Sequence, residues 1–251
     1  MVTRNTTHSR TRTSRSRWRR LVEFRDVYRL ELGRYQNRIR NFYDGPAGAM
    51  LSLASMVSLH EPLIGRLLKQ REFDVAQFKS ILDIGAGAGQ ILGHLVKRSA
   101  PDAQIVAVDL SHQMLRRARK RVESDRPVYV AADMLHLPFA DKSFDCITCG
   151  WVIEYFSDPR PALTELSRVL TPGGSLLMMV TESGFAGALT SRTWRCRTFT
   201  RSEFRHCCED VGLIWHRPMW FTKVHKILKF GGIVVEVRKP ELVNGTSTEG
   251  K

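Results

Sequence analysis

Short β-rich runs alternate with helical patterns from residue 79 onward, and no other feature of the sequence constrains the fold as strongly. The expected strands are residues 80–84, 103–109, 127–132, 144–150 and 175–181. Between them, apolar residues recur at three- and four-residue steps in 90–98, 112–122 and 159–170. This alternation predicts an α/β fold with a doubly wound, mostly parallel sheet that helices cover on both faces.

The segment after the fifth expected strand ends in a hairpin pattern. Thr200 and Glu203 form a capping box that opens a helix, and Gly212 ends that helix. Two further β-rich runs follow, 213–221 and 232–238, with no long helix between them. We therefore expect an antiparallel terminal hairpin at the edge of the sheet.

The rest of the chain divides around this α/β domain. Apolar residues at helical spacing predict N-terminal helices before it. We expect an arginine-rich disordered tail at 1–20, a helical cap at 21–75, the α/β domain at 76–240 and a flexible C-terminal tail at 241–251.

The positive charge is concentrated in the tail. Lys and Arg number 39 against 25 Asp and Glu, which gives a net charge of +14. Residues 1–20 hold seven of the arginines and no acid. Such a segment suits an anionic membrane surface or nucleic acid, a solvated tail, or an organelle transit peptide. Because half of the net charge lies there, it says little about the α/β domain.

Several protein classes are excluded by composition. No run of about eighteen apolar residues exists, so we expect no transmembrane helix. No apolar stretch follows the basic start, so we expect no secretory signal. The five cysteines are sparse, and Cys146 and Cys149 should face opposite sides of one strand, which argues against a metal site. We expect a cytoplasmic protein that binds no metal.

A glycine-rich turn marks the first strand-to-helix junction. Gly85, Gly87 and Gly89 stand at alternate positions and remove side chains where the backbone would pass close to a bound nucleoside. The dinucleotide fingerprint would require a fourth glycine at position 90, which is Gln90. The turn therefore indicates a nucleoside without specifying a dinucleotide.

Carboxylates follow three successive strands. Asp109 ends the second expected strand, where it can accept both hydroxyls of a ribose. Asp133 follows the third, where it can accept from an adenine amine while Met134 or Leu135 packs on the ring. Asp83 adds negative charge beside the glycine turn. Acids without a phosphate-binding Lys or Arg favour a cationic nucleoside, and S-adenosylmethionine fits that description.

The motifs as a set resemble the class I S-adenosylmethionine-dependent methyltransferases. The stretches DIGAGAG, VDLSHQML, AADMLHLPFADKSFDCI, IEYFSDP and LTPGGSL are similar to the type 11 group, which includes the C-methyltransferases of ubiquinone and menaquinone synthesis. The resemblance covers about 79–181, and the end of the hairpin at 237–240 also matches.

The resemblance implies a Rossmann-like sheet of seven strands with a reversed terminal hairpin, and S-adenosylmethionine as cofactor. It also implies that the acceptor faces the end of the fourth strand. We assign the cofactor site to Asp83, Gly85, Ala86, Gly87, Gly89, Asp109, Leu110, Asp133, Met134 and Gly150.

No catalytic base is evident. Relatives commonly carry Glu-His before the Asp-Pro step, whereas this chain carries Glu154-Tyr155. Glu154, Tyr155 and His60 are weak catalytic candidates, each with a structural role as the alternative. Methyl transfer from a sulfonium is an in-line displacement, in which alignment and exclusion of water can supply most of the rate. A base is needed only if the acceptor must first lose a proton.

Three functional hypotheses remain open. The favoured one is methylation, on carbon or oxygen, of a small apolar acceptor such as a quinone, phenol or lipid, with Phe42, Tyr43 and Trp151 as candidate walls beneath the N-terminal helices. The second is RNA methylation aided by the basic N-terminus, although residues 149–152 lack the Asn/Asp-Pro-Pro-Tyr turn of base-amine methyltransferases. The third is a non-catalytic cofactor-binding module recruited to a membrane or a protein partner through its arginines.

Overall fold

The computed structural model describes Gly33, Asn37, Asn41, Asp44, Gly45 and residues 60–68, 73–228 and 232–241. The predicted tail at 1–20, most of the predicted helical cap, and the candidate acceptor walls Phe42 and Tyr43 lie outside the described residues. Within these ranges, no helix has the length and apolar composition needed to cross a membrane.

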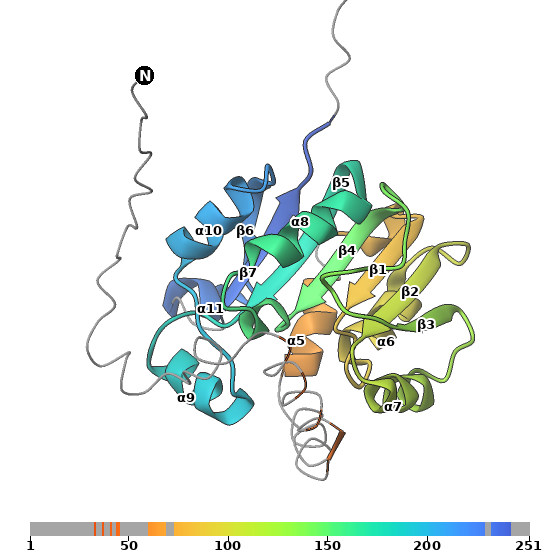
Figure 1. Cartoon of the computed structure of the whole chain (residues 1–251), viewed down its shortest axis with the longest axis horizontal. Coiled ribbons are helices and arrows are strands. Elements are labelled where there is room, and N and C mark those ends of the chain that lie inside the picture. The colour runs from red at the N-terminus through yellow and green to blue at the C-terminus, as the bar shows by residue number, and fades with distance from the viewer. Residues whose placement is uncertain are drawn as a thin grey trace, which may run out of the picture.

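The described residues form a seven-stranded sheet in the order β3-β2-β1-β4-β5-β7-β6 (Figure 1). Pairing is parallel from β3 to β5, whereas β7 is antiparallel to both of its neighbours. The predicted fold class and the reversed terminal hairpin are therefore confirmed. The strands are β1 Ser80–Ile84, β2 Gln104–Asp109, β3 Pro127–Ala131, β4 Phe144–Gly150, β5 Leu170–Val180, β6 Ile214–Met219 and β7 Ile233–Arg238.

Helices cover both faces of this sheet. On one face, α5 (His60–Leu67), α6 (Gln90–Arg98) and α7 (His112–Val122) share an apolar cluster with strand residues such as Ile81 and Leu177. On the other, α8 (Arg160–Val169) and α10 (Arg201–Glu209) pack on residues such as Ile147 and Met178; α8 crosses in front of the sheet in Figure 1. The central strands are buried on both sides, as their continuous apolar sequence requires.

Shorter elements complete the described chain. They are the 3-10 turns η1 (Val75–Gln77) and η2 (Ile153–Tyr155) and the helices α9 (Phe185–Trp194) and α11 (Lys223–Leu228). The sequence pattern did not predict α9, whose buried residues are the small Gly187, Ala188 and Ser191. Without a stripe of large apolar residues, the helix leaves no periodic signal.

One predicted boundary is wrong. The sequence placed Leu170 in a helix and began the strand at 175, but Leu170 already pairs with Phe144 at the start of β5. The Pro-Gly-Gly stretch at 172–174 reads as a turn, yet here it lies within the strand. A register shift between Phe144 and Cys146 accommodates it.

The two cysteines of β4 face opposite sides, as predicted. Cys146 belongs to the cluster under α6, and Cys149 to the cluster under α8. Burial raises the pKa of both thiols well above the ordinary value, so neither is poised to react as a thiolate.

Candidate functional site

The site lies where the parallel strands end. Ile84 of β1 pairs with Val108 of β2 and Cys149 of β4, and Asp109 pairs with Ala131 of β3. Because the register is parallel, the residues that follow β1, β2, β3 and β4 emerge at one edge of the sheet. We call this edge the carboxyl edge.

The glycine turn is open on one side and closed on the other. Gly85 has a φ of +66°, and a Cβ there would lie 2.1 Å from Cγ2 of Val152. Gly87 has a φ of +51°, but a Cβ there would meet nothing closer than the Gly85 carbonyl oxygen at 3.8 Å. Gly85 is thus needed for packing, whereas Gly87 leaves bare backbone beside open space.

Asp109 locks this turn to the end of β2. Its Oδ2 accepts a hydrogen bond from the Gly87 N–H at 2.9 Å, and its Oδ1 accepts from the Ser111 N–H at 2.8 Å. Burial raises the pKa of the carboxyl, and these bonds oppose the rise. A backbone hydrogen bond from Leu110 also opposes the rise, and a carboxylate with about four lone-pair sites can still accept a further donor.

Asp44 reaches the same place from a distant part of the chain. The Ser111 hydroxyl accepts the Met114 N–H as the N-cap of α7 and donates to Oδ1 of Asp44 at 2.5 Å. The charge of Asp44 also raises the pKa of Asp109. Sequence reasoning missed this residue, because Asp44 precedes Gly45 and Pro46 in what reads as a simple helix break.

Asp83 is a fully buried acid two residues before the glycine turn. Its Oδ1 accepts from the Thr148 hydroxyl at 2.7 Å, while its Oδ2 has no hydrogen-bond partner among the described residues. Burial raises the pKa of this carboxyl to about 7. A neighbouring cation would favour its charged form, so the residue suits a site for a positively charged ligand.

The residues after β3 lie at the same edge. Asp133 is half-buried and its Oδ1 accepts from the Leu135 N–H at 3.0 Å, which holds the turn. Met134 is buried in the core cluster under α8. Ala86 is buried in the cluster under α6, Leu110 and Gly150 are partly exposed, and Gly89 is the N-cap of α6.

Trp151, a candidate acceptor wall, and Tyr155, a catalytic candidate, both follow β4. Trp151 has a φ of +56°, a conformation that non-glycine residues seldom adopt and that often marks a functional turn. Its N–H donates to the Met179 carbonyl at 2.8 Å. The Tyr155 hydroxyl donates to the Trp194 carbonyl at 3.3 Å, which connects η2 to α9.

Glu154 is only 1% exposed. Its Oε1 accepts from the Thr181 N–H at 2.6 Å at the end of β5, and Oε2 has no hydrogen-bond partner among the described residues. Burial raises the pKa of this carboxyl to about 7. The geometry supports a structural role for Glu154, since its side chain connects η2 to the end of β5. The third candidate, His60, begins α5, but its side chain is not described.

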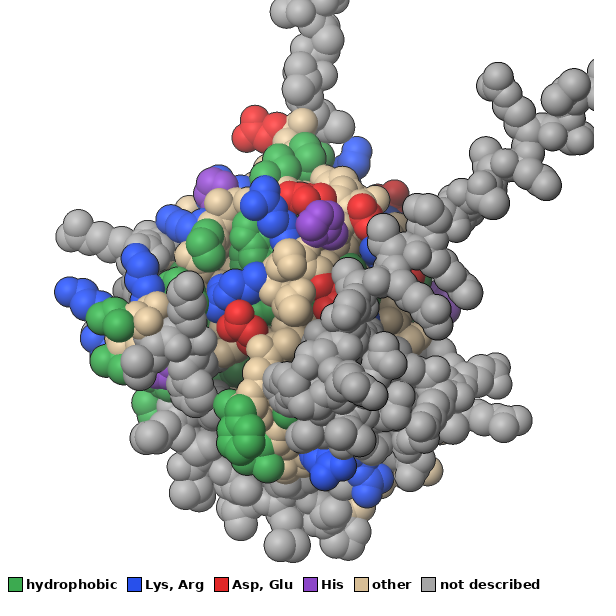
Figure 2. Space-filling view, turned by 90° about the vertical axis from the view of Figure 1, so that its left-hand side faces the viewer, with side chains coloured by type: hydrophobic (Ala, Val, Ile, Leu, Met, Phe, Trp, Pro, Cys, Tyr) green, Lys and Arg blue, Asp and Glu red, His purple; other side chains and the backbone are tan. Residues whose placement is uncertain are grey.

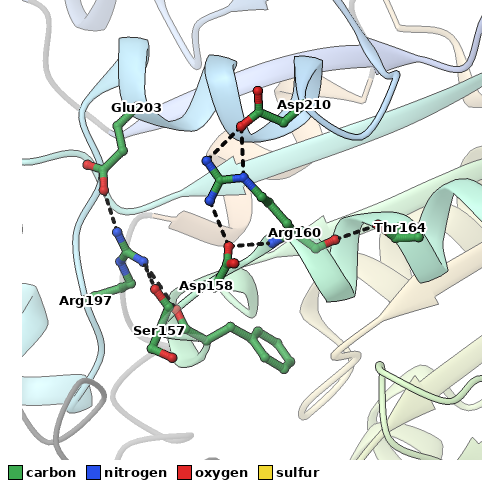
Figure 3. Close-up of polar contacts among 8 residues, drawn as sticks. Ser157, Asp158, Arg160, Thr164, Arg197, Glu203 and Asp210 are labelled. Carbon is green, nitrogen blue, oxygen red and sulfur yellow. Dashed lines mark hydrogen bonds and ion pairs between the residues drawn. The ribbon is translucent and has the colours of Figure 1, made fainter. Parts of the chain in front are cut away.

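A buried arginine, which the sequence analysis did not single out, supports the turn after β4. The Arg197 N–H donates to the Glu154 carbonyl at 3.1 Å. Its guanidinium donates to the Ser157 carbonyl, pairs with Glu203 at 2.5 Å and stacks 4.1 Å from the centroid of Phe199. Figure 3 shows Arg197 between Ser157 and Glu203, so it joins the turn after β4 to α10.

A second arginine holds α8 against α10. Arg160 donates from Nε and Nη2 to Oδ2 of Asp210 at 2.9 and 2.7 Å, and from Nη1 to Asp158 at 3.0 Å (Figure 3). The Asp158 carboxylate also accepts the Arg160 N–H at 3.1 Å, which satisfies a free donor near the start of α8. Together the two arginines connect the turn after β4 and the start of α8 to α10.

Residues 82–178 match the family model described as "Methyltransferase domain". The chain is 32% identical over 153 residues to the demethylmenaquinone methyltransferase of Clavibacter sepedonicus, which covers 61% of this chain and 61% of that protein. It is 31% identical over 150 residues to the ubiquinone/menaquinone biosynthesis C-methyltransferase of Methylococcus capsulatus, covering 57% of this chain and 59% of the relative. The matched part thus spans less than two thirds of these relatives.

The fold also has counterparts among solved structures. A chain from the Haloferax volcanii complex of the Trm112 methyltransferase activator with a methyltransferase superposes with a TM-score of 0.66 at 21% identity. The alignment covers 81% of this chain and 98% of that chain. At this level of identity the likeness concerns the fold alone.

Proposed function

We propose that this chain, whose α/β domain belongs to the class I S-adenosylmethionine-dependent methyltransferases of the type 11 group, methylates a small, rather apolar acceptor. The observation that supports methyl transfer is that Asp83 in β1, Asp109 at the end of β2 and Asp133 after β3 lie at the carboxyl edge, with Asp109 bonded directly to the glycine turn. S-adenosylmethionine is the cofactor of this family.

Each acid has a separate part in holding the cofactor. Asp109 accepts the ribose hydroxyls, and Asp133 with Met134 receives the adenine. The glycine turn and Asp83 receive the methionine portion, since the unpartnered Oδ2 of Asp83 is suited to a nearby positive charge. The bare backbone at Gly87 gives the cofactor room to approach.

The chain's own residues mainly orient the acceptor and exclude water from the reacting atoms. When bound, S-adenosylmethionine supplies an electrophilic methyl group on a sulfonium. Glu154 and Arg197 hold the turn after β4, and Trp151 at its bend forms one side of the acceptor position. Glu154 acts in this scheme as a positioning residue, because its carboxylate is bound to the backbone of β5. Alignment of the acceptor then provides most of the acceleration.

The acceptor class rests on what the relatives are named for. Two of the matched proteins are named as methyltransferases of menaquinone or ubiquinone synthesis. A prenylated quinol is therefore the first acceptor to test, with carbon rather than oxygen as the methylated atom.

The experiment is a methyl-transfer assay with the full chain. S-adenosylmethionine with a deuterated methyl is supplied with a demethylated naphthoquinol or benzoquinol, and mass spectrometry locates the label. We expect a ring-methylated product that is lost in Asp109→Ala and kept in Asp102→Ala, an exposed acid outside the site. Cofactor binding without transfer to these acceptors would refute the acceptor class while leaving the cofactor site intact.

A further inference from the structure

Two short helices expose large apolar side chains to solvent. On α9, Phe185 is 86% exposed and Leu189 is 65% exposed, one helical turn apart. On α11, Val224 and Ile227 are 60% and 78% exposed. We call these four residues the apolar rim. Large exposed apolar patches mark interaction surfaces, whereas single exposed apolar residues are ordinary, so what matters is whether the two helices share one surface.

Both helices stand at the carboxyl edge. α9 follows the end of β5. Val180 at that end pairs with Ile233 at the start of β7, and Met219 at the end of β6 pairs with Val234. The connection that carries α11 therefore leaves and re-enters the sheet beside the end of β5, and the apolar rim lies at the same edge as the cofactor residues.

Arg201 fixes the bases of both helices to each other. Its guanidinium pairs with Glu182 just before α9, at 2.8 and 2.9 Å. It also donates to the Gly232 carbonyl at 3.1 Å just after α11, and stacks 4.2 Å from the centroid of Trp220 just before α11. One side chain thus ties the two segments into a common surface.

The segments that carry the rim are basic and contain no acid. Residues 183–202 and 211–235 contain no Asp or Glu. Arg197, Arg201 and Arg217 in these segments pair with the flanking Glu203, Glu182 and Glu236, and the other cations are Arg192, Arg195 and three lysines. Arg192, Lys223 and Lys226 are exposed beside the apolar rim. Figure 2, which views the side of the molecule that bears these helices, shows hydrophobic side chains next to Lys and Arg.

We propose that the apolar rim inserts into an anionic phospholipid surface and holds the carboxyl edge against the membrane. Exposed aromatic and aliphatic side chains flanked by cations are the composition of an interfacial lipid-binding surface. The apolar side chains provide insertion and the cations provide attraction to lipid phosphates. The proposal goes beyond methyl transfer, because binding to lipid requires neither cofactor nor acceptor.

The first test measures the partition of the full chain onto vesicles of phosphatidylcholine and phosphatidylglycerol. The variant combines Phe185→Ser, Leu189→Gln, Val224→Thr and Ile227→Gln, all at exposed positions that leave the core intact. We expect its partition coefficient to fall by about tenfold or more. Val128→Ser is the matched control, because Val128 is 59% exposed on β3 at the other end of the sheet. Equal partition of wild type and the fourfold variant would overturn the proposal.

A second test separates insertion from attraction by other basic parts of the chain. An environment-sensitive fluorophore is attached at Phe185→Cys, with Val128→Cys as control; the native cysteines are buried. We expect a blue shift on vesicle binding at position 185 and none at 128. Binding without a shift at 185 would overturn the proposal. The fourfold variant could instead lose binding to single-stranded RNA while its binding to vesicles is unchanged. That result would also overturn the proposal, because it would assign the surface to nucleic acid.

Discussion

Gly85 illustrates how much a single position at the turn is constrained. It combines a positive φ with a neighbour, Val152, that occupies the space of any Cβ. Gly93, in the interior of α6, has a negative backbone φ and nothing within 4 Å of its Cβ position. The same substitution should therefore have opposite effects at these two glycines.

Gly85→Ala should lower the free energy of unfolding by about 2–4 kcal/mol, because it adds a clash to the cost of a left-handed conformation. Gly93→Ala should raise it by up to about 1 kcal/mol through helix propensity. Urea denaturation of both variants measures this. A free energy of unfolding in Gly85→Ala that is unchanged or raised would show that the turn is not packed as described.

The burial of Glu154 leads us to expect that the stability of the protein depends on pH. Its pKa is raised from 4.5 to about 7, so the folded protein holds a proton that the unfolded chain releases, and stability falls as pH rises between these values. Glu154→Gln keeps an acceptor for the Thr181 N–H but cannot ionise. Between pH 5 and 7.5, we expect the variant to gain about 1–3 kcal/mol relative to wild type. A difference that stays constant with pH would contradict the ionisation of a buried carboxyl.

At the scale of elements, sequence periodicity located the core strands and helices well. The predicted spans of α6 and α7 match the structure, because each has a stripe of large apolar residues and a clear end. It failed for α9, which buries only small side chains, and for the start of β5, where Pro-Gly-Gly lies inside a strand. Local pattern carries no information about such tertiary effects.

The candidate site also contains residues that the sequence predicted and residues that it did not. The placement of Asp83 in β1, Asp109 at the end of β2 and Asp133 after β3 could be predicted, because strand ends meet at one edge in a parallel sheet. Asp44 and Arg197 could not, since their partners Ser111 and Glu154 lie 67 and 43 positions away along the chain. The assignment of the ten cofactor residues stays a prediction.

Arg197 should matter more for stability than Arg160, although both connect to α10. The Arg197 side chain is 4% exposed, whereas that of Arg160 is 44% exposed. Arg197→Ala should lower the free energy of unfolding by about 2–4 kcal/mol, because it removes a buried guanidinium that pairs with Glu203 and donates to the Phe156 and Ser157 carbonyls. Arg160→Ala should cost less than about 1 kcal/mol. Thermal and urea unfolding of the two variants test this. Equal losses would contradict the conclusion that the more buried arginine contributes more to stability.

At the scale of the whole molecule, the order of the strands places the candidate functional residues at one edge of the sheet. The five parallel strands present the glycine turn, the acids and η2 there, and the reversed β7 brings α11 to the same edge. The net charge of +14 therefore does not describe the site, whose ionisable side chains at the strand ends are acids. The molecule thus carries a group of acids at the strand ends, our candidate cofactor site, at the same edge as the apolar rim.

The central claim is that Asp109 binds the ribose of S-adenosylmethionine. Isothermal titration calorimetry of the full chain, Asp109→Ala and the exposed control Asp102→Ala tests it, with thermal unfolding to verify that each variant is folded. We expect one cofactor per chain for wild type and control, and affinity at least about a hundredfold weaker for Asp109→Ala. A folded Asp109→Ala protein that binds S-adenosylmethionine as tightly as wild type would contradict the claim.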